Sequence, residues 1–479
     1  MANKILWYSV PSLHDSSNGA AIHNKILLEA LAARGIEVKV LNAFVADDQR
    51  GLENLKRIAA LIEQREKEQH PELANKPQRQ KDFLQFTDNK VEYYVVKTHG
   101  RLAQDVTATD QGKIFDFFIQ LLEKFQPDVI MGYSGDIFSC YLRHEAQARG
   151  IPVVYALCNG LHRGFAFADC DLVFSPSEAT AKLYRDEDGI DVKAVGQFIY
   201  RQQVTCDPAK RDPKYITLIN PAPEKGLAIF VKLAQLFNQR HPEQKFLVVK
   251  SVGDYNQLLT RLHYADGTTF VKVGDPNPIP MVDIAEHTND IRLVYAVTKV
   301  LLTPSVWHES WGCVATEAVF NNIPVLSSKS GGLPEAVRDG GILLDAPAST
   351  QNDYYCVPSD EELEPWLDAL ERLLNEDWTE QCQKASAYND LDHSVERLLE
   401  YLQPIMDRGQ QTKRPLEQSY FFSAPSMRRR KEAYGQLAQQ QQQAQQQQQA
   451  VQQQTQQQTA AQASAPAAQG AKSKGKKKK

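Results

Sequence analysis

The feature that most constrains the fold is a repeated alternation of short apolar runs with amphipathic helical segments. The N-terminal run KILWYSV is followed by a turn-rich polar loop, by helical spacing of apolar residues over 22–34, and by a second apolar run, IEVKVL. Gly35 separates the helix from that second run. Strand, helix and strand in this order form a parallel βαβ unit. We therefore expect an α/β protein built on parallel sheets.

The alternation continues to about residue 196. We expect helices over 52–62, 113–125 and 138–149, and strands at VEYYVV, DVIMGY, IPVVYAL, CDLVFSPS and VKAVG. The intervening segment from Gln64 to Lys81 is too polar to be buried, so we expect it to protrude as an insertion.

A second alternation starts near Tyr215. We expect strands at YITLIN, KFLVVKSV, TTFVKV, KVLLTPS, IPVLSS and GGILLD, and helices over 227–240 and after Trp311. Terminal helices are expected over 361–375 and 384–407. Two Rossmann-like halves in tandem explain this pattern with the fewest assumptions.

These elements predict the domain organisation. Residues 1–205 form the first Rossmann-like domain and residues 206–380 the second. Residues 381–409 form a C-terminal helix that packs back toward the first domain, and residues 410–479 form a tail. The tail is nearly all glutamine from 436 to 458 and ends in KSKGKKKK, a composition that cannot bury a core and is typical of disorder.

The net charge of −5 hides an uneven distribution. From Gln410 onward there are twelve Lys or Arg and two Asp or Glu, so the tail carries +10 and the preceding residues carry −15. An acidic body argues against nucleic acid as a specific partner. A solvated tail is the simpler interpretation of the basic end, and attraction to anionic membranes or RNA is the alternative.

The seven cysteines are an odd number, are widely scattered, and form no Cys-x-x-Cys pair. This pattern fits a reducing compartment and predicts no structural zinc. The N-terminal apolar run is too short for a signal peptide, and no segment has the ~20 apolar residues that a membrane span needs. We expect a cytoplasmic protein, with peripheral membrane contact through the tail as the alternative.

The stretch SVWHESWGCVATEAVFNNIPV carries the candidate site. The strand before it ends near Ser305, which places Glu309 at the carboxyl end of a parallel strand, where ligands of such sheets bind. Ser310 is the expected N-cap of a helix that begins at Trp311. Gly312 allows close approach of a ligand, and the helix N-terminus suits a phosphate. Glu317, two turns further on, suits the two hydroxyls of a ribose.

This segment, continuing through SSKSGGLPEAVRDGGILL, resembles the donor-binding segment of family-4 glycosyltransferases of the GT-B fold. The family's two glutamates eight residues apart correspond to Glu309 and Glu317, and its Gly-Gly-x-x-Glu loop corresponds to GGLPE. NPAPEKG resembles the family's Glu-Lys-Gly turn, which assigns Lys225 to the donor diphosphate. NGAAIHNKILLEALAARGIEV resembles its N-terminal loop and first helix, which assigns the backbone of Gly19 to the phosphates and the acceptor.

The chain departs from the family pattern at three asparagines. Asn220 stands where the family has an arginine, Asn18 where it has a glycine, and Asn159 where it often has a histidine. His162 or Arg163, shortly after Asn159, are the candidates to replace that histidine. These departures put activity in question more than fold.

The resemblance implies a retaining glycosyltransferase that uses a nucleotide-diphosphate sugar as donor and needs no metal or other cofactor. Glu309 and Lys225 would be catalytic, and the substrate-binding residues would be Gly19, Asn220, Ser310, Trp311, Gly312, Cys313, Glu317 and His162. The acceptor is a saccharide, a lipid or a protein, and the sequence does not distinguish these. Two other functions stay open: a nucleotide-sugar epimerase of the same fold, and a non-catalytic interaction module.

Overall fold

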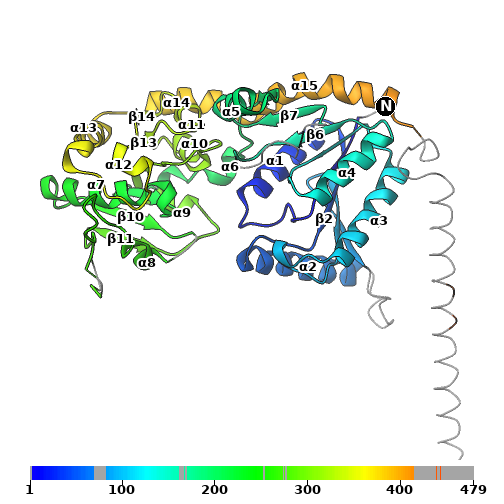
Figure 1. Cartoon of the computed structure of the whole chain (residues 1–479), viewed down its shortest axis with the longest axis horizontal. Coiled ribbons are helices and arrows are strands. Elements are labelled where there is room, and N and C mark those ends of the chain that lie inside the picture. The colour runs from blue at the N-terminus through cyan, green and yellow to red at the C-terminus, as the bar shows by residue number, and fades with distance from the viewer. Residues whose placement is uncertain are drawn as a thin grey trace, which may run out of the picture. The chain divides into compact units, whose positions relative to one another are not determined.

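The computed structural model describes residues 3–69, 82–160, 167, 170–251, 254–272, 274–275 and 278–414, with residues 439 and 443 besides. Residues up to Arg414 form one compact unit. It contains two sheets, one in each half of the chain (Figure 1). The expected α/β architecture with two parallel-sheet domains is confirmed.

The first sheet has eight strands in the order β3-β4-β2-β1-β5-β6-β7-β8. All neighbours are parallel except β3 and β4. The strands are β1 (Lys4–Ser9), β2 (Glu37–Ala43), β3 (Phe83–Asp88), β4 (Val91–Val96), β5 (Val129–Gly132), β6 (Val153–Ala156), β7 (Leu172–Ser175) and β8 (Val192–Ala194).

Helices cover both faces of this sheet. The helices of the first half are α1 (Gly19–Ala33), α2 (Gln49–Gln69), α3 (Ala108–Phe125), α4 (Ile137–Ala148) and α5 (Glu178–Asp188). The short helix α6 (Arg201–Val204) leads to the second half. The predicted insertion is helical as far as Gln69, and its residues 70–81 lie outside the described part of the chain.

The second sheet has six parallel strands in the order β11-β10-β9-β12-β13-β14, which is the strand order of a Rossmann fold. The strands are β9 (Tyr215–Ile219), β10 (Lys245–Val249), β11 (Val282–Ala285), β12 (Thr298–Thr303), β13 (Val325–Ser328) and β14 (Gly341–Leu344). The helices are α7 (Leu227–Arg240), α8 (Tyr255–Leu259), α9 (Arg292–Val297), α10 (Cys313–Phe320), α11 (Leu333–Val337), α12 (Ala348–Gln351), α13 (Asp360–Asn375) and α14 (Thr379–Tyr388).

The last helix, α15 (Leu391–Thr412), returns to the first half and packs against α1, β5 and β7 (Figure 1). Its apolar side chains belong to the same core cluster as Ile5 and Trp7 of β1. Four of them are fully buried: Val395, Leu398, Leu402 and Met406. The core of the first half is therefore completed by residues from the end of the second alternation.

The predicted strand TTFVKV is wrong. Its described residues, 268–272, form bends and irregular backbone with one isolated bridge, between Thr269 and His263. Phe270 packs on Tyr264, and Val271 is buried in the core of the second half. The apolar residues therefore fill a loop, and the third strand of the sheet is β11 instead. That strand was not predicted because Asp283 interrupts its apolar run; the Asp283 carboxylate accepts a hydrogen bond from the Tyr215 hydroxyl at 2.9 Å.

Two further elements differ from the expectation. The sequence analysis contained no β3, which pairs with β4 through a tight turn in which Asn89 and Lys90 both have positive φ. The single helix expected over 384–407 is two helices, α14 and α15. They separate because the Asp390 side chain caps the N-terminus of α15 by accepting from the Asp392 backbone N–H.

The predicted domain boundaries fall as follows. The 205/206 boundary lies between β8 and β9, directly after α6. The 380/381 boundary lies inside α14, which packs on α10 of the second half. The predicted start of the tail at residue 410 lies inside α15, and the tail from residue 415 lies outside the described residues, apart from two isolated positions.

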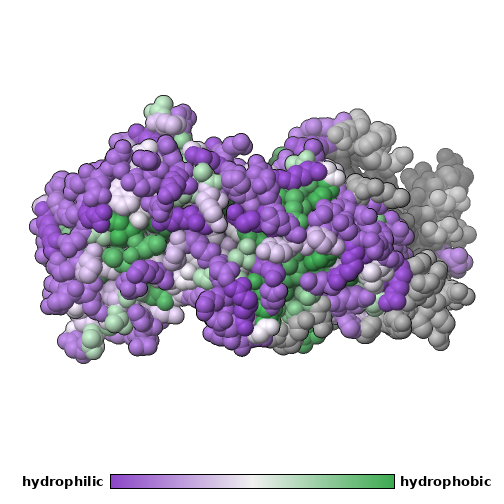
Figure 2. All heavy atoms as spheres, turned by 90° about the horizontal axis from the view of Figure 1, so that it is seen from above, coloured by the Kyte–Doolittle hydropathy of each residue, from purple (hydrophilic) through white to green (hydrophobic). Residues whose placement is uncertain are grey.

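On the face seen in Figure 2, most side chains are hydrophilic and the apolar ones gather in separate patches. The most exposed large apolar side chains come from different elements, with Ile137 at the start of α4 and Leu293 in α9. Among the residues that the structure describes, no helix combines the length and the apolar character required to span a bilayer.

Candidate functional site

The candidate site is a cavity of about 810 Å³ lined by residues of both halves. Its walls include the carboxyl ends of β9 and β12 and the loop after β1. These are the positions at which strand order reverses in each sheet, since β1 lies between β2 and β5, and β9 between β10 and β12. Open parallel sheets bind ligands at such points.

The predicted site residues gather at this cavity with two exceptions. Those that line it are Gly19, Asn220, Lys225, Glu309, Ser310, Trp311, Gly312 and Cys313. Glu317 is not among the lining residues, and His162 lies outside the described residues.

Lys225 and Glu309 form an ion pair in the wall from the second half. The Lys225 Nζ donates to Glu309 Oε1 at 2.6 Å and lies 4.6 Å from the ring centroid of Trp307. The Ser305 hydroxyl donates to the same carboxylate oxygen at 2.8 Å. The pair therefore joins the turn after β9 to the loop after β12, with both side chains largely buried.

A glycine fixes the turn that carries Lys225. Gly226 has φ +86°, and a Cβ there would collide with the carbonyl oxygen of Pro304. Because only glycine combines this backbone conformation with so close an approach, the turn can rest against the end of β12. The resemblance to a Glu-Lys-Gly turn thus has a structural reason in this chain.

The GGLPE loop supports Glu309 from behind. The Gly332 N–H donates to the Glu309 carbonyl at 2.7 Å. Gly331 has φ +54°, and a Cβ there would collide with the Glu309 backbone. Both glycines are therefore needed to hold the backbone of Glu309 at the cavity wall.

The predicted N-cap at Ser310 is wrong. Helix α10 begins at Cys313, its capping position is Gly312 with φ +102°, and no side chain caps it. A left-handed residue cannot be part of a right-handed helix, so the helix starts only after Gly312. Trp311 is buried and donates from Nε1 to the Thr316 hydroxyl at 2.9 Å. The first N–H groups of α10 consequently have no side-chain acceptor and are suited to an anion.

Glu317 lies in α10, beyond the lining residues. Its carboxylate accepts from the Tyr295 hydroxyl at 2.7 Å, and burial raises its pKa above the usual value. His23 of α1 interacts electrostatically with it, and the His23 Nδ1 lies 2.8 Å from the Phe198 carbonyl oxygen. Since a carbonyl only accepts, Nδ1 carries the proton of this imidazole. Burial lowers the pKa of His23, so it is neutral at neutral pH.

Asn220 has φ +65°, a conformation that asparagine tolerates better than most side chains. Its N–H donates to the Val249 carbonyl at 3.0 Å. Its side-chain oxygen is buried and has no hydrogen-bond partner among the described residues. A polar group directed at the cavity wall therefore stands where the family resemblance implies a cation.

Asn18 caps the N-terminus of α1. The Asn18 Oδ1 accepts from the Ala21 N–H at 3.0 Å, and its amide nitrogen donates to Asp47. Gly19 is the first helical residue, and a Cβ built on it would meet no atom within 4 Å. Gly19 therefore borders open space, while the N-terminus of α1 already has a side-chain acceptor.

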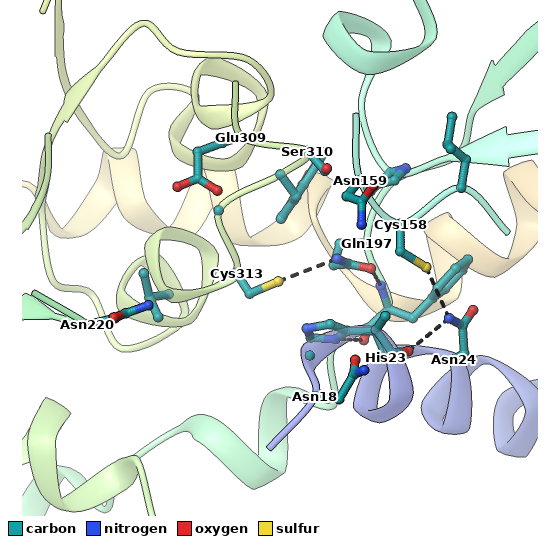
Figure 3. Close-up of a pocket in the computed structure, with 18 of the residues that line it drawn as sticks. Asn18, His23, Asn24, Cys158, Asn159, Gln197, Asn220, Glu309, Ser310 and Cys313 are labelled. Carbon is teal, nitrogen blue, oxygen red and sulfur yellow. Dashed lines mark hydrogen bonds between the residues drawn. The ribbon is translucent and has the colours of Figure 1, made fainter. Parts of the chain in front are cut away.

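Several residues of the first-half wall were not identified from sequence (Figure 3). Asn24 donates from Nδ2 to Cys158 Sγ at 3.3 Å, and Gln197 donates from Nε2 to Cys313 Sγ at 3.4 Å. Burial raises the pKa of Cys158 to about 11 and that of Cys313 to about 12. Both thiols thus stay protonated at neutral pH and are poor nucleophiles. The described residues include no group of three or more His, Cys, Asp or Glu suited to a metal.

Glu335 of the GGLPE loop connects the two halves at the N-terminus of α5. Its carboxylate accepts from the backbone N–H of Glu178 at 2.8 Å and of Ala179 at 2.9 Å. His308 adds a contact from Nε2 to the Thr180 hydroxyl at 3.2 Å. The loop that supports Glu309 is thereby attached to the first half as well.

Comparison with known proteins agrees with this geometry. Residues 207–390 match the family model described as glycosyl transferases group 1. The chain is 29% identical over 165 residues to the D-inositol 3-phosphate glycosyltransferase of Corynebacterium diphtheriae, and the matched segment covers 33% of each chain. It is 43% identical over 60 residues to the same-named protein of Streptomyces bingchenggensis, covering 12% of this chain and 13% of that one. The chain thus spans a third or less of the length of these relatives.

Solved structures extend the similarity to both halves. A glycosyltransferase from Rickettsia africae superposes with a TM-score of 0.56 at 12% identity, covering 85% of this chain and 99% of that one. HepE from Anabaena in complex with UDP superposes with a TM-score of 0.56 at 16% identity, covering 84% and 100%. At these identities the likeness concerns the fold, and it confirms the expected GT-B architecture.

Proposed function

We propose that this protein is a glycosyltransferase that uses a nucleotide-diphosphate sugar as donor, because residues 207–390 match the model of the group 1 glycosyl transferases and the two halves together have the GT-B fold. The observation that carries the proposal is the Lys225–Glu309 pair beside the uncapped N-terminus of α10. A cation and a helix N-terminus in one cavity suit a diphosphate, and a carboxylate suits sugar hydroxyls.

The proposed reaction exchanges one C–O bond for another. The bond between the anomeric carbon and the diphosphate breaks with its electron pair on the diphosphate oxygen, and the acceptor oxygen bonds to that carbon. The acceptor's hydroxyl proton passes to the departing phosphate. Lys225 and the N–H groups of α10 stabilise the charge that grows on the diphosphate, which is worth about 2.7–4 kcal/mol for each well-placed donor. Retention of anomeric configuration follows from the family resemblance.

The two glutamates have different places in this proposal. Glu309 orients the donor sugar, and its backbone support by Gly331 and Gly332 keeps it in position. Glu317 holds the ribose. Because Glu317 is not among the cavity-lining residues, this role requires its hydrogen bond with Tyr295 to rearrange when the nucleotide binds. The proposal assigns the stabilisation of this charge to Lys225 and the N-terminus of α10 and uses no metal.

The experiment has two stages. Thermal shift with UDP-, GDP- and ADP-sugars identifies the donor, and consumption of that donor is then measured with wild type and with Glu309→Ala. We expect the variant to lose turnover while it keeps affinity for the free nucleotide. Loss of nucleotide affinity in Glu309→Ala would place this carboxylate at the nucleotide and contradict its role at the sugar.

Asn220 favours one alternative. Asn220 stands where the resemblance implies an arginine, so Lys225 is the one lysine, and there is no arginine, among the described residues that line the cavity. A wall with so little positive charge fits a non-catalytic module that binds a nucleotide sugar without transferring the sugar. Binding of a donor by wild type with no consumption in the presence of any acceptor would support this alternative. Interconversion of sugar nucleotides without an acceptor would instead support an epimerase.

A further inference from the structure

The first-half wall of the cavity has a chemistry of its own, centred on Asn18 and Asp47. Both residues line the cavity, one in the loop after β1 and the other in the loop after β2. The Asn18 amide donates to Asp47 Oδ2, so the two side chains form one unit at the wall. The two loops are neighbours because β1 and β2 are adjacent strands.

The position of Asp47 is fixed from beneath by a second carboxylate. The Asp47 N–H donates to Asp15 Oδ2 at 2.8 Å. Asp15 is fully buried, and its other oxygen accepts from the backbone N–H and the hydroxyl of Ser17 at 2.9 and 2.6 Å. Asp15 is therefore occupied by hydrogen bonds within the loop after β1 and to the loop after β2, and Asp47 is the carboxylate that the loop after β2 presents to the cavity.

The N-terminus of α1 does not offer the anion site that a free helix end would provide. The Asn18 side chain accepts from the Ala21 N–H and takes up a donor that a glycine would have left free. An anion at this point would also meet the negative charge of Asp47. Asn18, which stands where the family has a glycine, thus places a hydrogen-bond acceptor at a helix end that could otherwise bind an anion.

The remaining charge on this wall is low. Among the described first-half residues that line the cavity there is no lysine or arginine, and His23 is neutral at neutral pH. The other polar residues of this wall include Ser134, Asn159 and Gln197, which are uncharged. A wall made of one carboxylate and several neutral polar groups suits a ligand that donates hydrogen bonds and carries no negative charge.

Because Lys225 and the N-terminus of α10 assign the second-half wall to the donor, we propose that the first-half wall binds the acceptor, that this acceptor is an uncharged polyol, such as a saccharide, whose hydroxyl groups donate to Asp47, and that phosphorylated acceptors are excluded. The proposal rests on the proposed function and adds the chemical class of the acceptor. It distinguishes this chain from its relatives, whose name specifies a phosphorylated inositol. Asp47 is a specificity-determining residue in this scheme.

The test measures acceptor binding directly, by saturation-transfer NMR on the full-length protein with and without UDP. The probes are matched pairs that differ by one phosphate: myo-inositol with D-inositol 3-phosphate, glucose with glucose 6-phosphate, and maltose with maltose 1-phosphate. We expect the uncharged member of each binding pair to bind at least about tenfold more tightly. Asp47→Asn should weaken it on the order of tenfold, which is the loss of one hydrogen bond to a charged group.

Asp48→Asn is the matched control. It removes the same charge one residue further on, from a side chain that caps α2 by accepting from the Gly51 N–H and does not line the cavity. Its acceptor affinities should match those of wild type. The proposal is overturned if the phosphorylated members bind more tightly, if no uncharged member binds, or if Asp47→Asn behaves as Asp48→Asn does.

Failure of the proposed function would look different. In that case neither UDP nor any nucleotide sugar would bind. The preference for one member of each acceptor pair can still be measured then, because it is also determined without nucleotide. Binding of nucleotide together with preference for phosphorylated acceptors would retain the glycosyltransferase and reject the acceptor class.

Discussion

Replacement of Lys225 by alanine is the most informative perturbation of the site. The Lys225 ammonium is paired with Glu309 at 2.6 Å and lies over the Trp307 ring. The substitution removes the cation proposed for the diphosphate and also leaves Glu309 without its partner. Two losses therefore act in the same direction.

The magnitude follows from these two losses. Removal of one donor that acts on transition-state charge lowers kcat about 10²–10³-fold. The side chain of Glu309 is only 11% exposed, so its unpaired charge repels the diphosphate in a poorly screened environment. We expect a loss at the upper end of this range, together with weaker nucleotide binding. Lys225→Arg should recover only part of the turnover, because a planar guanidinium does not replace a compact ammonium in a tight turn.

A second substitution separates the two effects. Adding Glu309→Gln to Lys225→Ala removes the repulsion but not the loss of the cation. The double variant should therefore bind nucleotide more tightly than Lys225→Ala and stay as slow in turnover. Nucleotide affinity is measured by calorimetry and turnover by consumption of the donor identified by thermal shift.

Lys232 supplies a control of nearly identical local chemistry. Its Nζ lies 2.6 Å from an Asp360 carboxylate oxygen and 5.9 Å from the ring centroid of Tyr264, on α7 and away from the cavity lining. Lys232→Ala should cost up to about 1 kcal/mol of stability and leave turnover unchanged. If Lys225→Ala kept turnover within about threefold of Lys232→Ala, the assignment of Lys225 to the diphosphate would be refuted.

Three further predictions concern the surroundings of the site. Burial raises the pKa of Glu317 above its unfolded value of about 4.5, so its contribution to stability is full below that pH and is lost as pH rises through the folded pKa. Glu317→Gln keeps an acceptor for Tyr295 but does not titrate. The difference in Tm between this variant and wild type should therefore change in favour of the variant as the pH rises from about 4 to about 8, and a constant difference would contradict the raised pKa. The variant should also bind nucleotide more weakly. Glu335→Ala should lower the free energy of unfolding by on the order of 1 kcal/mol and Glu335→Gln by less, as measured in urea, because the carboxylate accepts two N–H groups at a helix N-terminus. Truncation after residue 414 should leave Tm unchanged. Truncation after residue 409 should lower Tm, because it removes the 2.6 Å contact between Lys413 Nζ and the buried Asp128. Equal Tm values for the two truncated proteins would show that this contact contributes nothing to stability.

The elements that could be predicted from sequence are those whose signal is local. Helix α7 was predicted at its observed limits because apolar spacing of helical period runs through it and Gly226 precedes it. The assignment of Lys225 to the same site as Glu309 came from the family resemblance of NPAPEKG. The structure supplies its physical reason, because the carboxyl ends of β9 and β12 meet at one edge of the sheet.

The remainder depends on contacts between segments distant in sequence. The partner of Glu317 is Tyr295, the acceptor for the first two N–H groups of α5 is Glu335, and the first-half wall contains Asp47. No local pattern marks Tyr295 or Asp47, and the GGLPE motif, which contains Glu335, does not indicate that its carboxylate reaches α5. The start of α10 was placed two residues too early because Ser310 is a good capping residue in isolation. The left-handed backbone of Gly312, imposed by close packing against Leu333, moves the start of the helix.

The return of α15 to the first half has a consequence for how the chain is made. A ribosome adds roughly 5–20 residues each second and releases the N-terminal part first. The first sheet is complete in sequence when β8 ends at Ala194, yet the groove that receives Leu398 and Met406 stays empty until those residues emerge, some two hundred residues later. For about 10–40 s the nascent first half thus exposes apolar side chains that the native protein hides, and during this interval it depends on chaperones or on rapid folding of the second half to avoid aggregation.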